Sequence, residues 1–348
     1  MNRIFATILA VLGLGITSCA QNEHIKSVDA DEFEKAVNAQ PVQLVDVRTA
    51  GEYSEGCIAY AQNIDVNQSN FKQQALQQLK KQQPVYVYCR SGKRSMNAAN
   101  QLAESGFEVV NLKGGILEWG QAGKVIAQHD AFTTPSGKTV HLYVVKHGSV
   151  RIHYDGKEFE IDPVEAMNPA TDYTQYPKAD YILVTHEHFD HCDAKAIEHL
   201  TKQGTRLITN QNCHKLLGKG EIMRNGDELQ LSGGITLKAV PAYNYSADKQ
   251  QFHPKGRDNG FILTLDGFRI YLAGDTEDIP EMKAIKDIDV AYLPCNLPYT
   301  MTPEQAAHAA EIIQPKVLFP YHYGQTKIER VAELLKNSKV DVRIRNYQ

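Results

Sequence analysis

The sequence predicts an α/β fold divided into two domains. Short apolar runs alternate with stretches of helical pattern along the chain, which is the order expected of α/β proteins. The length of 348 residues exceeds that of a usual single core, and two groups of reactive side chains occupy separate blocks. Turn-forming residues cluster around Pro135. We therefore expect one domain at 20–125, a linker at 126–135 and a second domain at 136–348.

Residues 1–19 have the pattern of an export signal. A basic tip at Arg3 precedes an apolar stretch at 4–16 that is too short to span a membrane comfortably. Residues 16–19, Ile-Thr-Ser-Cys, resemble a bacterial lipobox, which implies that Cys19 becomes the lipidated first residue of the mature protein. The alternatives are an ordinary signal peptide and an uncleaved anchor. We expect a membrane-anchored lipoprotein on the periplasmic or cell-surface side.

A cysteine stands at the end of an alternating β-rich run in the first block. Residues 85–88, Val-Tyr-Val-Tyr, lead to Cys89, and a polar turn then begins a helical stretch. At this position backbone N–H groups and the positive end of the helix favour a thiolate over a thiol. The nearby cations act in the same direction: Arg90, Lys93 and Arg94. The sequence therefore predicts a nucleophilic Cys89.

Residues 25–125 resemble rhodanese-type sulfurtransferases. The resemblance includes Leu-Val-Asp-Val-Arg at 44–48 and Gly-Gly-Ile-Leu-Glu-Trp at 114–119. It implies a small parallel-sheet α/β domain in which Cys89 takes sulfur from a sulfane-sulfur donor and carries it as a persulfide. The persulfide loop would consist of Arg90, Ser91, Gly92, Lys93, Arg94 and Ser95.

One segment departs from the rhodanese pattern. Residues 55–59 read Glu-Gly-Cys-Ile-Ala, where rhodaneses usually have Gly-His-Ile-Pro-Gly, so we expect unusual packing at this turn. The alternative to an active sulfurtransferase is an inactive module used for docking. Because inactive copies usually lose the cysteine, the retained Cys89 favours activity.

Three imidazoles and a carboxylate crowd one short loop in the second block. An apolar run at 181–184 is followed by Thr-His-Glu-His-Phe-Asp-His at 185–191. A turn after a strand can point alternate side chains at one or two cations, and imidazole with carboxylate suits Zn²⁺-like ions. We expect one ligand pair for each ion, His186 with His188 and Asp190 with His191. The alternative, a solvated polar loop, is disfavoured by the acidic and histidine segments further along the chain.

The His-x-His-x-Asp-His pattern resembles the metallo-β-lactamase superfamily, whose fold is an αββα sandwich with two sheets between helical layers. Three further segments carry the resemblance: Ile-Asp-Pro at 161–163, Ala-Gly-Asp-Thr at 273–276 and Phe-Pro-Tyr-His at 319–322. The resemblance implies that Asp162 orients the metal loop without binding metal. It also implies that Asp275 bridges both ions and that His322 completes the second ion.

The third motif of that superfamily is altered in this chain. Where many members have a histidine shortly after a proline, Asn244 stands here, and an amide is a poor Zn²⁺ ligand. A branch of the superfamily combines Pro-Ala-Tyr-Asn with Phe-His-Pro-Lys, as found here at 241–244 and 252–255. We therefore predict His253 as the remaining ligand of the first ion. The alternatives are a weakened first position and an Asn244 that only hydrogen-bonds near the substrate.

The ligand set predicts a metal-dependent hydrolase of a small-molecule substrate. Two divalent ions, Zn²⁺ first with manganese or iron as alternatives, would lower the pKa of a water from about 15.7 toward neutrality. Amide, ester, lactone and phosphodiester bonds are all accessible to this chemistry. The resemblance gives Asp190 a catalytic role besides its role as a ligand. We also place His147 near the site, as a residue that supports a ligand.

Two other functions compete with hydrolysis. A mononuclear iron persulfide dioxygenase combines the same fold with a rhodanese module, but that family has a Gly-His-Thr segment that this sequence lacks. A metal-stabilised binding scaffold beside a persulfide receptor would be non-enzymatic. The net charge of −4 and the lack of a basic run argue against a nucleic-acid binder.

Overall fold

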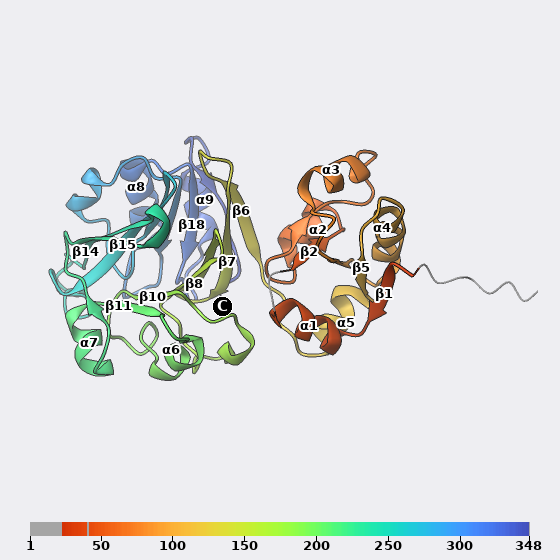
Figure 1. Cartoon of the computed structure of the whole chain (residues 1–348). Helices are drawn as coiled ribbons and strands as arrows, with labels where there is room; N and C mark the ends of the chain where they lie inside the picture. The colour runs from red at the N-terminus through yellow and green to blue at the C-terminus, as the bar shows by residue number, and fades with distance from the viewer. Residues whose placement is uncertain (1–22, 40–41, 348) are drawn as a thin grey trace, which may run out of the picture.

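The computed structural model describes residues 23–39 and 42–347. The predicted signal at 1–19, with Cys19, lies outside the described residues. Figure 1 shows two bodies of mixed α/β structure, one in the red-to-yellow part of the chain and one in the green-to-blue part. No helix in these two ranges is long and apolar enough to cross a bilayer.

The first domain is a parallel sheet flanked by helices. Its strands follow the order β1-β5-β4-β2-β3, and each neighbouring pair is parallel. The elements are β1 (Ile25–Val28), α1 (Ala30–Ala39), β2 (Gln43–Asp46), α2 (Ala50–Glu55), β3 (Gln62–Asn63), α3 (Phe71–Gln78), β4 (Val85–Tyr88), α4 (Lys93–Glu104), β5 (Val109–Leu112) and α5 (Gly115–Gln121). Strand β4 is apolar throughout because Val87 enters one buried cluster and Tyr88 enters another on the opposite face.

The second domain contains two sheets, in the orders β12-β11-β10-β9-β8-β7-β6 and β13-β14-β15-β16-β17-β18-β19. The first sheet consists of β6 (His129–Thr133), β7 (Thr139–Lys146), β8 (Ser149–Tyr154), β9 (Lys157–Ile161), β10 (Tyr181–Val184), β11 (Arg206–Thr209) and β12 (Glu221–Ile222). The second consists of β13 (Glu228–Gln230), β14 (Thr236–Ala242), β15 (Asp258–Leu265), β16 (Phe268–Leu272), β17 (Val290–Pro294), β18 (Val317–Tyr321) and β19 (Asp341–Val342). The helices are α6 (Ala194–Leu200), α7 (Gln211–Leu217), α8 (Pro303–Ile313) and α9 (Glu329–Leu334), with short 3-10 turns η1 (Tyr173–Gln175), η2 (Ser232–Gly234) and η3 (Pro280–Ala284).

These two sheets pack face to face around one large core. Ile152 of β8 and Phe261 of β15 belong to the same buried cluster, and both are fully buried. A separate cluster joins Ile197 of α6 to Val184 of β10 on the outer face of the first sheet. Figure 1 shows α6 and α7 on one side of the sheets and α8 and α9 on the other. The predicted αββα sandwich beside a rhodanese-like parallel sheet is therefore confirmed.

The segment predicted as a linker, 126–135, carries regular structure. Its residues 129–133 form β6, which pairs antiparallel with β7. The turn-forming residues around Pro135 close this hairpin, with Thr134 N donating to Lys138 O over 2.8 Å. Turn composition is common to linkers and hairpins, so composition alone does not distinguish them.

The altered turn at 55–59 lies at the contact between the two domains. Cys57 N donates to Ala127 O over 2.9 Å, and Ala127 N donates to Cys57 O over 2.8 Å. Cys57 Sγ lies 3.2 Å from Nδ1 of His129 on β6. The segment that departs from the rhodanese pattern is thus the one that touches the second domain.

Tyr60 extends this contact. Its backbone N–H donates to the hydroxyl of Tyr143 over 2.8 Å. Its ring centroid lies 4.6 Å from the guanidinium carbon of Arg151, a buried cation that also pairs with Glu158 at 3.0 Å. Because a desolvated cation attracts an aromatic face more strongly than an exposed one, Tyr60 helps to hold the first domain against the second.

We expect Tyr60→Ala to loosen the domain contact by about 1–2 kcal/mol, the value of a partly desolvated cation–π pair. The measurement is amide hydrogen exchange at Cys57 and Ala127, whose N–H groups bond across the contact. Exchange should become roughly tenfold faster. Leu76→Ala, an exposed residue of α3, is the control and should change neither amide. Unaltered exchange in Tyr60→Ala would show that Tyr60 does not hold the contact.

Candidate metal centre

The histidine loop is held in place by Asp162, which directly follows β9. The Asp162 carboxylate is fully buried and accepts bonds from Thr185 N and Thr185 Oγ1, each at 2.7 Å. It also accepts from Nδ1 of His191 at 2.9 Å. This bond leaves Nε2 of His191 as the free ligand atom. The structure therefore places Asp162 behind the loop.

A first cluster contains His186, His188 and His253, whose ligand atoms lie within 4.8 Å of one another. The Nε2 atom of His186 and the Nδ1 atom of His188 are 3.1 Å apart. Three imidazoles in this arrangement match the ligand types of a Zn²⁺ site. The cluster joins two segments far apart in the sequence, the loop after β10 and the loop before β15.

Of the two candidates in the altered motif, the structure brings His253 to the cluster. The His253 Nδ1 atom lies 3.0 Å from Asp258 Oδ2, so that its Nε2 atom faces the cluster. Asn244 instead donates through Nδ2 to Tyr299 O at 2.7 Å and to Lys249 O at 3.2 Å, and its backbone N–H donates to His253 O. Asn244 therefore braces the loop that carries His253.

A second cluster contains His147, Asp190, His191 and His322. Nε2 of His322 lies 2.9 Å from Nε2 of His191. His147 is closer to the centre than predicted, because its Nε2 atom lies 3.0 Å from Asp190 Oδ2 and its ring centroid lies 3.7 Å from that of His322. His147 thus lies among the predicted ligands themselves.

Asp275 connects the two clusters. Its Oδ2 atom lies 3.3 Å from Nε2 of His253 in the first cluster. Its Oδ1 atom lies 3.4 Å from Nε2 of His191 and 3.5 Å from Nε2 of His322 in the second. The carboxylate is only 3% exposed, and Oδ1 has no hydrogen-bond partner within residues 23–39 and 42–347. A cationic partner at Oδ1 would remove that deficit.

Backbone geometry brings the second cluster close together. His147, Asp162 and His322 have φ angles of 49°, 46° and 46°, a region that side-chain-bearing residues seldom adopt. At Gly148 an added Cβ would lie 2.8 Å from Cε1 of His191. A glycine there lets the β7–β8 turn approach the imidazole. Sequence reasoning missed Gly148, Thr185 and Asp258, because their importance depends on contacts between distant segments.

Burial and mutual charge determine the protonation of these groups. Burial lowers the pKa of His186 well below its usual value, and the neighbouring His191 lowers it further. Burial opposes protonation of His191 as well, but Asp275, Asp190 and Asp162 together raise its pKa to about 10. Asp258 and Asp275 raise the pKa of His253 to about 9 against its own burial.

The carboxylates shift in the opposite sense. Burial alone would raise the pKa values of Asp190 and Asp275, but His191 and His322 hold both well below the usual range. Buried carboxylates therefore stay ionised and keep protons on the imidazoles beside them. A metal ion that binds here must displace those protons. The donor types, their spacing and the unpartnered Asp275 Oδ1 all fit divalent ions.

In the first domain, Cys89 lies in a cradle between β4 and α4. The thiol is 1% exposed, and Ser95 Oγ donates to its sulfur at 3.5 Å. Burial opposes ionisation, but the Ser95 hydroxyl and the backbone N–H groups of Ser95, Ser91 and Arg94 lower the pKa of Cys89 below its usual value.

The cations of the loop stabilise the Cys89 thiolate less than the sequence predicts. The Arg94 guanidinium forms two bonds to Glu52, at 2.8 and 2.6 Å, and the Arg90 and Lys93 side chains are exposed. Neutralised or solvated cations act weakly on a buried sulfur. Hydrogen bonds, more than cations, therefore stabilise the thiolate.

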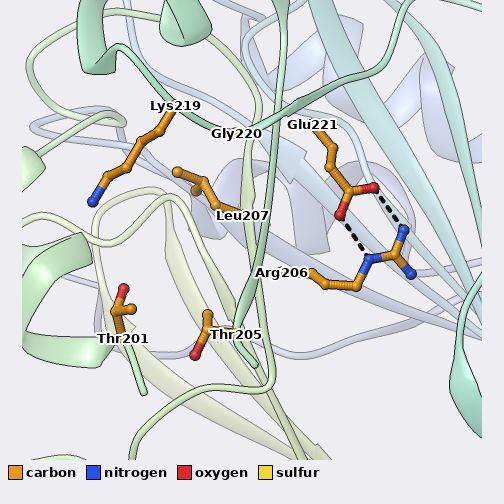
Figure 2. Close-up of a pocket in the computed structure, with 7 residues that line it drawn as sticks. All are labelled: Thr201, Thr205, Arg206, Leu207, Lys219, Gly220 and Glu221. Carbon is orange, nitrogen blue, oxygen red and sulfur yellow. Dashed lines mark hydrogen bonds and ion pairs between the residues drawn. The ribbon is translucent and has the colours of Figure 1, made fainter. Parts of the chain in front are cut away.

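A surface pocket of about 300 Å³ lies elsewhere on the second domain. It is lined by Thr201, Thr205, Arg206, Leu207, Lys219, Gly220 and Glu221. Figure 2 shows Arg206 and Glu221 joined by two bonds, each 2.7 Å long. Arg206 pairs in register with Tyr181 at the start of β10, whereas the histidine loop follows the end of β10. The pocket thus lies at the opposite edge of the sheet from the candidate centre.

Comparisons with known proteins agree with this geometry. Residues 141–322 match the family model for a β-lactamase superfamily domain, and residues 29–122 match that for a rhodanese-like domain. A UPF0173 metal-dependent hydrolase of Ligilactobacillus salivarius is 35% identical over 186 residues, 51% of this chain and 82% of the relative. Another, of Lysinibacillus sphaericus, is 33% identical over 211 residues, 56% of this chain and 92% of the relative.

Solved structures show the same similarity. A crystal structure described as that of a metal-dependent hydrolase from Parabacteroides distasonis is 52% identical, with a TM-score of 0.62, and covers 64% of this chain and 100% of its own. Igni18, a metallo hydrolase from Ignicoccus hospitalis, is 27% identical, with a TM-score of 0.51, and covers 60% of this chain and 95% of its own.

We expect Asp258→Asn to weaken metal binding by about 10- to 100-fold, because the amide no longer holds the His253 imidazole in its orientation. The measurement is a titration of metal-free protein with Zn²⁺ against a competing chelator. Glu281→Gln is the matched control, since Glu281 pairs with Lys255 of the same loop but is not bonded to His253. Equal affinities in Asp258→Asn and the unmodified chain would mean that Asp258 does not support metal binding through His253.

Proposed function

The chain belongs to the UPF0173 family of metal-dependent hydrolases in the β-lactamase superfamily, and we propose that its second domain hydrolyses a small-molecule substrate with two divalent metal ions, zinc being the first choice. The observation that carries this proposal is the Asp275 carboxylate, whose two oxygens face different histidine clusters. His186, His188 and His253 would hold the first ion. Asp190, His191 and His322 would hold the second, with Asp275 shared.

Different residues of the centre would have different roles in hydrolysis. When bound, a pair of divalent ions supplies Lewis acidity and lowers the pKa of water toward neutrality. His147, whose pKa is lowered by burial, is neutral at ordinary pH and donates through Nε2 to Asp190. This bond fixes the ionised Asp190 carboxylate, which would accept a hydrogen bond from the attacking water and hold that water in line with the bond to be cleaved. Amide, ester, lactone and phosphodiester bonds all fit this chemistry.

The alternative of an iron persulfide dioxygenase receives no support from the comparisons, whose relatives are named as metal-dependent hydrolases. A purely structural role for the metal would not require the partly buried Asp190 carboxylate to lie beside a neutral imidazole. Hydrolysis therefore accounts for more of the geometry than either competing function.

A second proposal concerns the first domain, which we infer to be an active sulfurtransferase. The Cys89 thiolate would attack the outer sulfur of a sulfane-sulfur donor such as thiosulfate. An S–S bond to Cys89 forms, the S–S bond of thiosulfate breaks, and sulfite leaves with its electron pair. The lowered pKa of Cys89 and its cradle of N–H groups support this step, since both stabilise the anionic persulfide.

Export and membrane attachment through Cys19 are also proposed, on the lipobox-like pattern at 16–19 alone. This arrangement would place the hydrolase and the sulfurtransferase on the periplasmic or cell-surface side of the membrane, where sulfane-sulfur donors and small-molecule substrates would both reach them.

We expect the full chain to contain about two divalent ions and His253→Ala to retain about one, because only the first cluster loses a ligand. The measurement is elemental analysis of anaerobically purified protein, with activity followed on ester, lactone, amide and phosphodiester panels. Asp266→Asn is the control and should keep both ions, because this carboxylate lies in the β15–β16 turn and bonds Thr134. Two ions retained in His253→Ala, or a single iron in the unmodified chain, would contradict the proposal.

For the first domain, mass spectrometry after incubation with thiosulfate should detect a persulfide in the unmodified chain and none in Cys89→Ala. Because Ser95 Oγ stabilises the thiolate, Ser95→Ala should raise the pKa of Cys89, so that thiolate absorbance appears at higher pH. Ser91→Ala keeps the contributing backbone N–H and should leave the titration unchanged. A persulfide in Cys89→Ala would assign the sulfur to another cysteine.

A further inference from the structure

Large apolar side chains are exposed around the metal centre. In the described ranges of the chain, eight such side chains are exposed, and four of them lie on loops that carry or adjoin the predicted ligands: Phe189, Tyr245, Leu297 and Tyr299. The other four are Leu76, Leu117, Ile126 and Leu216. Single exposed apolar residues are common on protein surfaces, but their concentration at one edge of a fold marks a binding region.

Sheet topology explains why Leu297 and Tyr299 belong to that edge. Strands β16, β17 and β18 are parallel neighbours, so their carboxyl ends meet at the same edge of the sheet. Asp275 follows β16, and His322 follows β18. The loop after β17, residues 295–301, therefore lies between two predicted ligands. Leu297 and Tyr299 are each 44% exposed on this loop.

Tyr299 is also tied to the loop of the first cluster. Its ring packs edge-to-face on Phe252, with centroids 5.1 Å apart, and Phe252 directly precedes His253. The Tyr299 carbonyl accepts the bond from Asn244 Nδ2. These contacts hold an aromatic surface beside His253. Charge on this side is neutralised, since Arg257 bonds Asp258.

Phe189 faces solvent from the histidine loop itself. It stands between His188 and Asp190 and is 81% exposed. The turn around it is held by His191 N, which donates to His188 O over 3.0 Å. The phenyl ring is therefore presented to solvent from the same short turn that carries two predicted ligands. Exposure of such a ring is unfavourable unless a ligand covers it.

We propose that the substrate carries an apolar chain or ring next to the bond that is cleaved, and that Phe189, Leu297 and Tyr299 contact this group. The inference rests on the proposed metal-dependent hydrolysis and adds the substrate class to it. A substrate that is charged throughout, such as a sugar phosphate, would leave these side chains exposed. An acyl or aryl group would cover them and gain roughly fourfold in affinity for each methylene group removed from water.

The test uses metal-binding ligands, so that the cleaved bond need not be known. Acetohydroxamate and octanohydroxamate share a head group that binds divalent ions through two oxygens and differ only in the apolar chain. Calorimetry on the zinc-loaded full chain should show octanohydroxamate binding tighter by on the order of a hundredfold, the value for burying roughly half of its additional methylene groups. Phe189→Ala and Tyr299→Ala should each reduce this ratio several-fold. Leu76→Ala, an exposed apolar residue of the first domain, should leave the ratio unchanged.

The outcomes separate the two proposals. If acetohydroxamate does not bind at all, the metal centre itself is wrong. If both hydroxamates bind with equal affinity, the centre stands and the apolar substrate class is wrong. Tyr299 lies outside the histidine loop, so a lower ratio in Tyr299→Ala with unaltered acetohydroxamate binding reports lost apolar contact. An undiminished ratio in both variants would overturn the assignment of these side chains.

Discussion

The structure depends on one electrostatic constraint, the placement of three carboxylates among imidazoles where little water enters. Asp162, Asp190 and Asp275 all face His191, and together they raise the pKa of that imidazole against its own burial. Burial of unpaired charge is costly, so the arrangement requires a cationic partner, either protons or metal ions. Two of the imidazole nitrogens lie only 2.9 Å apart. Metal ions would balance the same negative charge and would also bind these nitrogens, so that no protons need to lie between them.

The fold supplies these groups from the carboxyl ends of strands in both sheets. Strand β9 provides Asp162, β10 the histidine loop, β16 Asp275 and β18 His322. Since the two sheets share one core, packing far from the centre fixes the separation of these strand ends. Carboxylates behind the imidazoles then fix the orientation of the rings. Asp162 orients His191, and Asp258 orients His253.

The sequence predicts the local part of this centre well and the distant part less well. His186, His188, Asp190 and His191 are adjacent, so one motif contains them all. The choice between Asn244 and His253 depends on how one loop folds back, which follows from the carbonyl groups that Asn244 binds. The exposed position of Phe189 likewise becomes visible only in three dimensions. The segment predicted as a linker likewise contains strand β6. This strand is defined by its antiparallel pairing with β7, which the composition of the segment does not reveal.

The most direct test of the account is a crystal structure of the zinc-loaded chain with anomalous scattering measured at the zinc edge. The account predicts two peaks about 3.5–4 Å apart, one beside His186, His188 and His253 and one beside Asp190, His191 and His322, with Asp275 touching both. A single peak, or peaks away from these side chains, would contradict it.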